Sequence, residues 1–132
     1  MNAALIPATL DAIATLIERG DFLGAETRAQ AALQSLPPHA EVWRLLAIAQ
    51  LRTGKIDAAR RSLGQANHLD PRSIEVLCNL AAVESHGGNL PAARALLERA
   101  LELAPNHLEV LSNLGRLRHR LGDLAGAAQC FE

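Results

Sequence analysis

The sequence predicts an all-α fold that consists of about three and a half copies of one pair of antiparallel helices. Two observations predict it. Hydrophobic residues make up 49% of the chain and aromatic residues only 2%, so alanine and leucine, the best apolar helix formers, dominate. Runs of alternating β-branched residues, which would favour strands, are missing. In addition, glycine, alanine and proline recur at intervals of 34 residues, and such a period indicates a repeated structural unit.

The period is visible in four columns that share one register. They are Gly20, Gly54, Gly88 and Gly122; Ala25, Ala59, Ala93 and Ala127; Ala32, Ala66 and Ala100; and Pro37, Pro71 and Pro105. The chain has only nine glycines and six prolines, so composition alone does not account for these coincidences. The columns therefore mark equivalent positions in successive copies.

The copy at 40–73 shows that the unit is a helical hairpin. Spacings of three, one and three place four residues on one face of its first helix: Trp43, Leu46, Ala47 and Gln50. Its second helix has an apolar stripe formed by Ile56, Ala59, Leu63 and Ala66. Gly54 can take the left-handed backbone that ends a helix, and Pro71 closes the unit because proline cannot continue one.

In this register the copies are 6–39, 40–73, 74–107 and an incomplete fourth at 108–132, and together they form a single array without linkers. Helices are expected over 6–19, 23–35, 40–53, 57–69, 74–86, 91–103, 108–121 and 125–132. Pro7 and Pro91 should lie in the first turns of their helices, where a missing N–H has no cost.

The pattern resembles the tetratricopeptide repeat family over nearly the full chain. The matching residues of the second copy, in order, are Trp43, Leu46, Ala47, Gly54, Ala59, Leu63, Ala66 and Pro71. The resemblance implies an α-α solenoid, a right-handed superhelix whose first helices line a concave groove. It implies a scaffold that binds a peptide or a partner protein in that groove.

One column departs from the family, which usually has an aromatic residue three positions after the small residue of the first helix. This chain has Leu16, Gln50, Glu84 and Arg118 there. Because successive first helices should lie side by side, we expect Glu84 and Arg118 to form an ion pair between the third and fourth copies.

Several functional classes are disfavoured. A net charge of −1 gives no field that would attract nucleic acid or an anionic membrane. No apolar run is long enough to span a bilayer, and the N-terminus lacks a basic leader, so a cytoplasmic location is expected. No Walker loop, HExxH, GxSxG or paired CxxC motif occurs, so we expect no enzyme activity, no cofactor and no metal. Two cysteines, Cys78 and Cys130, are too few for a disulfide framework, and we expect reduced thiols.

By the resemblance, polar residues of the first helices should face the ligand. The candidate peptide-binding residues are Arg44, Arg52, Asn79, His86, Asn113, Arg116 and Arg120. The amides of Asn79 and Asn113 share a column, and they either hold a peptide backbone or pack adjacent repeats. The arginines either bind carboxylates of an acidic peptide or are ordinary solvated charges near helix ends.

Some tetratricopeptide domains clamp the acidic C-termini of heat-shock chaperones with lysines and asparagines. The corresponding positions here are Arg44, Ile48, Asn79, Glu109 and Asn113, and Ile48 and Glu109 have the wrong chemistry for that motif. Two alternatives to a free-standing scaffold stay open. The chain is the recognition arm of a larger enzyme, such as a glycosyltransferase or sulfotransferase, or it forms a homo-dimer through its C-terminal repeat.

Overall fold

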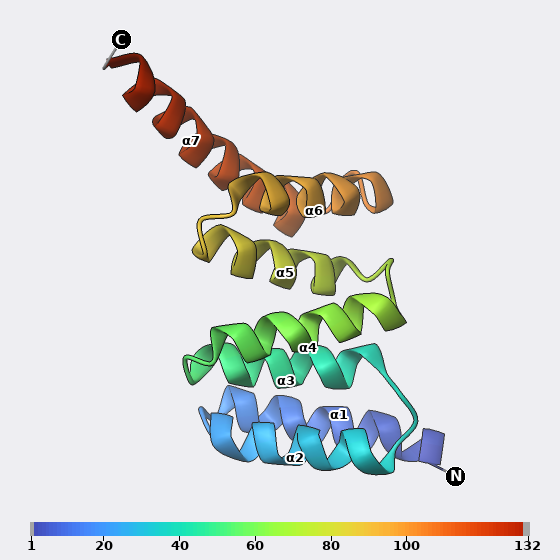
Figure 1. Cartoon of the computed structure of the whole chain (residues 1–132). Coiled ribbons are helices and arrows are strands. Elements are labelled where there is room, and N and C mark those ends of the chain that lie inside the picture. The colour runs from blue at the N-terminus through green and yellow to red at the C-terminus, as the bar shows by residue number, and fades with distance from the viewer. Residues whose placement is uncertain (1, 131–132) are drawn as a thin grey trace. The chain divides into compact units, whose positions relative to one another are not determined.

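The computed structural model describes residues 2–130 of the chain and the side chains of residues 5–122. Within that range the chain forms seven α-helices and no β-strand (Figure 1). The helices are α1 (Asn2–Glu18), α2 (Phe22–Ser35), α3 (Ala40–Arg52), α4 (Ile56–Leu69), α5 (Ile74–His86), α6 (Leu90–Leu103) and α7 (Leu108–Cys130). The prediction of an all-α fold is confirmed. None of these helices has both the length and the apolar character needed to cross a membrane.

Helices α2 to α6 begin and end within one residue of the predicted ranges. The prediction for α1 was wrong, because this helix begins at Asn2 and Pro7 lies inside it. Good helix formers precede the proline, and they extend the helix toward the N-terminus. Proline lacks an N–H, so its position near the start of the helix leaves a single carbonyl, that of Ala3, without an intrahelical partner. Pro91 lies in the first turn of α6 as predicted.

The predicted glycine turns form in the first three copies. Gly20, Gly54 and Gly88 have φ angles of 80°, 81° and 83°, which lie in the left-handed region that glycine tolerates best. In the third copy the next amide, Asn89 N, donates to Glu84 O at 2.8 Å. Such a bond across six residues satisfies a free carbonyl at the helix end and reverses the chain tightly.

The fourth glycine of the column behaves differently, and the predicted break after residue 121 is wrong. Gly122 lies inside α7, which continues without interruption to Cys130 (Figure 1). Residues 131 and 132, the end of the predicted last helix, lie outside the described residues. The straight helix keeps every backbone hydrogen bond through Gly122, whereas a hairpin must offset the lost bonds by packing a second helix on the first.

The chain divides into two compact units, Met1–Pro71 and Arg72–Glu132, which are described separately. In the first unit α3 packs on α1 and α2, and α4 packs on α3. In the second unit α7 packs in the same way on α5 and α6. The core of the second unit is formed by Leu77, Cys78, Ala81, Leu90, Ala93, Leu97, Ala100, Val110, Leu114 and Leu117.

Polar residues replace the family's usual aromatic residue in the first helices of the second and third copies, and their contacts differ. Gln50 is buried in the first unit, and its Oε1 accepts a hydrogen bond from Ser62 Oγ at 2.7 Å, which satisfies a polar group that burial would otherwise penalise. Glu84 accepts from Asn89 Nδ2 at 3.0 Å, while Arg118 is exposed on α7. The ion pair between Glu84 and Arg118 stays a prediction, and the contact described for the Glu84 carboxylate is the one with Asn89.

The two kinds of glycine should respond in opposite ways to alanine. Gly88→Ala forces a side chain into the left-handed region, and we expect it to lower the free energy of unfolding by about 1–2 kcal/mol. Gly122→Ala replaces glycine inside a helix, so it should leave that free energy unchanged or raise it by up to about 1 kcal/mol. Urea denaturation of the two variants measures both values. Equal destabilisation would mean that Gly122 also needs a left-handed backbone.

Candidate functional site

The second unit contains a cavity of about 330 Å³ between α5, α6 and α7. Its floor is apolar and is formed by Ala81, Ala82, Ala93, Leu97 and Leu117. Its rim is polar and is formed by Ser85, His86, Asn113, Arg116 and Arg120. An apolar floor with a few convergent polar groups is the usual composition of a ligand site in proteins.

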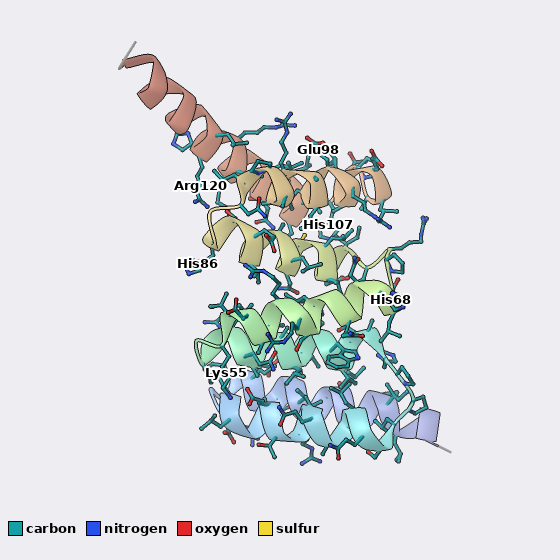
Figure 2. The ribbon with its side chains drawn as sticks, in the orientation of Figure 1. Lys55, His68, His86, Glu98, His107 and Arg120 are labelled. Atoms are coloured by element: carbon teal, nitrogen blue, oxygen red, sulfur yellow. The ribbon has the colours of Figure 1, made fainter. Side chains whose placement is uncertain are left out.

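Helix geometry explains why these residues converge. Asn113, Arg116, Leu117 and Arg120 are spaced three, one and three residues apart, so they occupy one face of α7. Three of the six lining residues from α5 and α6 are alanines, whose short side chains leave space in front of that face. Figure 2 shows His86 and Arg120 at the same end of the unit.

The two cavity arginines make different contacts. Arg116 donates from Nη2 to Asn113 Oδ1 one turn earlier on α7. Arg120 donates from Nη1 to the carbonyl oxygen of Ser85 at 3.1 Å and to Ser85 Oγ. Arg120 thus ties α7 to the last turn of α5, whose carbonyls lack intrahelical partners. Arg116 is the arginine whose contacts stay within its own helix.

Cys78 lies in the core of the second unit, next to Asn113. Burial raises the pKa of its thiol to about 11, and the carboxylates of Glu109 and Glu75 act in the same direction. A hydrogen bond with the Asn113 side chain lowers that pKa and only partly offsets the burial. The thiol is therefore protonated at neutral pH and does not serve as a nucleophile.

Asn113 contacts two neighbours inside the unit, the guanidinium of Arg116 and the thiol of Cys78. These contacts use one of the two lone pairs of the amide oxygen and one of the two N–H donors, so Asn113 packs within its unit and keeps hydrogen-bonding capacity. Asn79, its equivalent on α5, is half-buried and does not line the cavity.

The structure brings together four of the seven predicted binding residues. His86, Asn113, Arg116 and Arg120 line the cavity of the second unit. Arg44 and Arg52 belong to the first unit.

Neighbouring side chains already contact the two predicted binding arginines of the first unit. Arg44 forms a bidentate contact with Glu41, with Nε to Oε1 at 2.7 Å and Nη2 to Oε2 at 2.9 Å. The guanidinium carbon of Arg52 lies 5.9 Å from the ring centre of Phe22, a cation–π distance. Their charge is therefore partly compensated before any ligand arrives.

Sequence reasoning missed the cavity floor and one ion pair. Ala82, Leu97 and Leu117 look like ordinary packing positions, and no signal in the sequence distinguishes them. Lys55 Nζ lies 2.6 Å from Glu26 Oε1, which joins the start of α4 to a buried position of α2 (Figure 2). The two residues are 29 positions apart, and only packing brings them together.

Among the described side chains, no three of His, Cys, Asp and Glu come together in a way that could hold a metal ion. The cavity instead offers hydrogen-bond donors. The guanidinium groups of Arg116 and Arg120 are always protonated, so the site suits a carboxylate or another anion beside an apolar group.

Comparisons with known proteins give a consistent result. Tetratricopeptide repeat family patterns match residues 16–83 and 72–132. A sequence comparison with curated proteins gives no match.

Solved structures of similar fold cover most of the chain. The tetratricopeptide domain of Sgt2 from Aspergillus fumigatus has a TM-score of 0.84 at 15% identity, over 92% of this chain and 82% of that one. The second such domain of human RPAP3, in complex with the HSP70 peptide SGPTIEEVD, has a TM-score of 0.79 at 18% identity, over 89% and 98%. A mutant O-GlcNAc transferase of Thermobaculum terrenum has a TM-score of 0.82 at 29% identity, over 90% of this chain and 23% of that one.

The environment of Cys78 predicts slow alkylation. In a Cys130→Ser background at pH 8, a thiol with a pKa of about 11 is ionised in roughly one molecule in a thousand. Iodoacetamide should therefore modify the folded chain about 100-fold more slowly than the chain unfolded in guanidinium, whose thiol pKa is about 8.5. The rate should keep rising about tenfold per pH unit beyond pH 9 while the fold persists. A rate that levels off near pH 9 would contradict a buried thiol at this position.

Proposed function

Because the chain belongs to the tetratricopeptide repeat family, we propose that it is a non-catalytic scaffold that binds a peptide segment of a partner protein. The cavity between α5, α6 and α7 is the observation that carries the proposal. It combines a place for an apolar side chain with two guanidinium groups at its rim. We infer that the ligand is an acidic peptide whose carboxylate lies at the rim.

Arg116 is the residue on which this proposal mainly depends. Arg120 already holds the carbonyl of Ser85, so part of its hydrogen-bonding capacity serves the fold. Arg116 is exposed and contacts Asn113 of its own helix, so it can turn toward a ligand at the cost of one hydrogen bond. A carboxylate would replace that neutral acceptor with a charged one, and it can accept two parallel hydrogen bonds from the guanidinium group, which strengthens the contact and fixes its geometry.

The RPAP3 domain binds a peptide that ends in acidic residues, but we do not propose the same binding mode for this chain. Ile48 and Glu109 stand at two positions of the chaperone clamp, which is built from lysines and asparagines, and neither side chain has that chemistry. Glu109 is exposed in the first turn of α7, where its carboxylate interacts favourably with the helix dipole. The same carboxylate would repel the carboxylates of an acidic peptide. We therefore expect the cavity to bind the acidic ligand, and we do not expect a clamp that recognises the C-terminus of a peptide.

Peptide selection tests the proposal even while the partner is unidentified. Random heptapeptides displayed on phage and selected on the immobilised 132-residue chain should be enriched in Asp or Glu at one position. Arg116→Glu should abolish that enrichment and weaken binding of a selected, labelled peptide by about 10- to 100-fold, which corresponds to one lost charge-assisted hydrogen bond. Fluorescence anisotropy measures the dissociation constants.

Arg99→Glu is the matched control, because Arg99 is exposed on α6 and does not line the cavity. It changes the net charge by the same amount and should alter the dissociation constant less than threefold at moderate salt, since exposed charges are screened. Equal losses in the two variants would indicate a nonspecific charge effect. Acidic enrichment that persists in Arg116→Glu would exclude the cavity as the site.

A second candidate is that the chain is the recognition arm of a multidomain enzyme, such as a glycosyltransferase or a sulfotransferase. The observation that favours it is the 29% identity to a region that makes up 23% of the O-GlcNAc transferase chain. In that case the partner peptide is a substrate of the attached catalytic domain.

The gene sequence beyond codon 132 distinguishes the two candidates. A recognition arm predicts an open reading frame that continues into a catalytic domain of several hundred residues. A stop codon or further helical repeats without such a domain would leave the scaffold as the function.

A further inference from the structure

The two units of the chain contain the same arrangement of three helices, which allows their equivalent positions to be compared. Helices α1, α2 and α3 pack on one another in the first unit, as α5, α6 and α7 do in the second. Equivalent positions are two repeats of 34 residues apart. Each residue that lines the cavity therefore has a counterpart in the first unit, and this counterpart shows which side chain occupies the same place there.

The counterparts of three cavity residues are isoleucines, namely Ile13, Ile17 and Ile48. They stand at the positions of Ala81, Ser85 and Arg116, respectively. All three isoleucines pack in the core of the first unit, and Ile13 has no exposed surface. The first unit thus fills this place with its own branched aliphatic side chains, whereas the second unit has small or charged residues there.

The deeper positions change in the opposite direction. Leu97 and Leu117 of the cavity floor stand where the first unit has Ala29 and Ala49, and all four residues are buried. The two leucines fill the bottom of the place that the isoleucines occupy in the first unit. The space that is left in the second unit therefore lies toward the polar rim, next to Arg116.

The size of the cavity limits what can enter it. Its volume of about 330 Å³ is near the lower end of the range of about 300–1,000 Å³ that is usual for ligand sites. It is therefore suited to one side chain of a peptide and not to a longer segment. Consecutive Cα atoms are about 3.8 Å apart, so an acidic residue that reaches the rim must be close in sequence to the residue that is inserted.

We propose, as an extension of the peptide-binding function proposed above, that the ligand inserts one branched aliphatic side chain into this cavity. The anchor is an isoleucine, leucine or valine, and it lies within two positions of the acidic residue that binds Arg116. It takes the place that Ile17 and Ile48 have in the first unit, and burial of its side chain provides the apolar part of the affinity. The equivalent place in the first unit is already filled, so it does not take a second anchor.

The peptides from the selection described above test the anchor directly. Selected sequences should be enriched in isoleucine, leucine or valine within two positions of the acidic residue. Replacing that aliphatic residue of a selected, labelled peptide by alanine should weaken binding about 10- to 100-fold, as expected for the loss of one buried aliphatic side chain. Fluorescence anisotropy with the unmodified 132-residue chain measures this ratio.

Filling the cavity from the protein side tests where the anchor binds. Ser85→Ile introduces the side chain that Ile17 has in the first unit, and Ser85→Ala removes the same hydroxyl without filling the cavity. Ser85→Ile should bind the peptide at least about tenfold more weakly than Ser85→Ala. With Ser85→Ile, replacing the anchor of the peptide by alanine should cost less than about threefold, because the two changes act on the same space.

Ala95→Ile is the matched control, because Ala95 is exposed on α6 and does not line the cavity. It adds the same side chain elsewhere in the second unit and should change the dissociation constant less than about threefold, since distant sites act independently. Circular dichroism checks the fold of each variant. If Ser85→Ile does not fold, Ala82→Ile replaces it, because Ala82 is exposed at the cavity and the same position of the second copy is Ile48.

The possible failures separate this inference from the proposed function. Acidic peptides without an aliphatic residue near the acid, or with an aromatic one in its place, would overturn the anchor and leave the acidic-peptide scaffold intact. An equal cost of the alanine peptide with the unmodified chain and with the filled variant would mean that the anchor binds outside the cavity. A selection without acidic enrichment would contradict the proposed function, and the anchor with it.

Discussion

Close approach of helices through small side chains is the constraint on which the structure depends. Ala25, Ala59 and Ala93 have no exposed surface, and each lies near the start of the second helix of its copy. Only a small side chain fits where two backbones cross closely, and larger residues on either side then interdigitate. The alanine columns therefore fix where each hairpin crosses, and the glycine turns need only return the chain to that point.

The repeat register predicted most of the fold because it reports local chemistry. A glycine that must adopt a left-handed backbone recurs at the same position of each copy, and this recurrence forms a column in the sequence. An alanine at a helix crossing recurs in the same way. The register failed at Gly122, because a glycine turn forms only where the helix that follows it packs on the helix before it. The sequence of 122–128 carries the turn and cap signals, but whether they are used depends on how much surface the next helix buries.

The binding site was harder to predict than the fold. The resemblance gave Asn113, Arg116 and Arg120 as candidates, and all three line the cavity from one face of α7, because their spacing depends on that helix alone. Spacing did not reveal that Glu41 neutralises Arg44, or that Arg120 is tied to Ser85, 35 positions away. Whether a charged side chain is available to a ligand depends on its neighbours in three dimensions, and a single sequence does not contain that information.

Helix α7 carries the cavity residues on one face and the exposed side chains of Leu108 and Leu111 on another. At 100° per residue, Asn113, Arg116 and Arg120 centre about half a turn away from Leu111, Gly115 and Gly122. The Arg120 contact with Ser85 helps to fix the packing of α7 on α5 and α6, so a substitution that removes this contact acts on the fold as well as on the cavity.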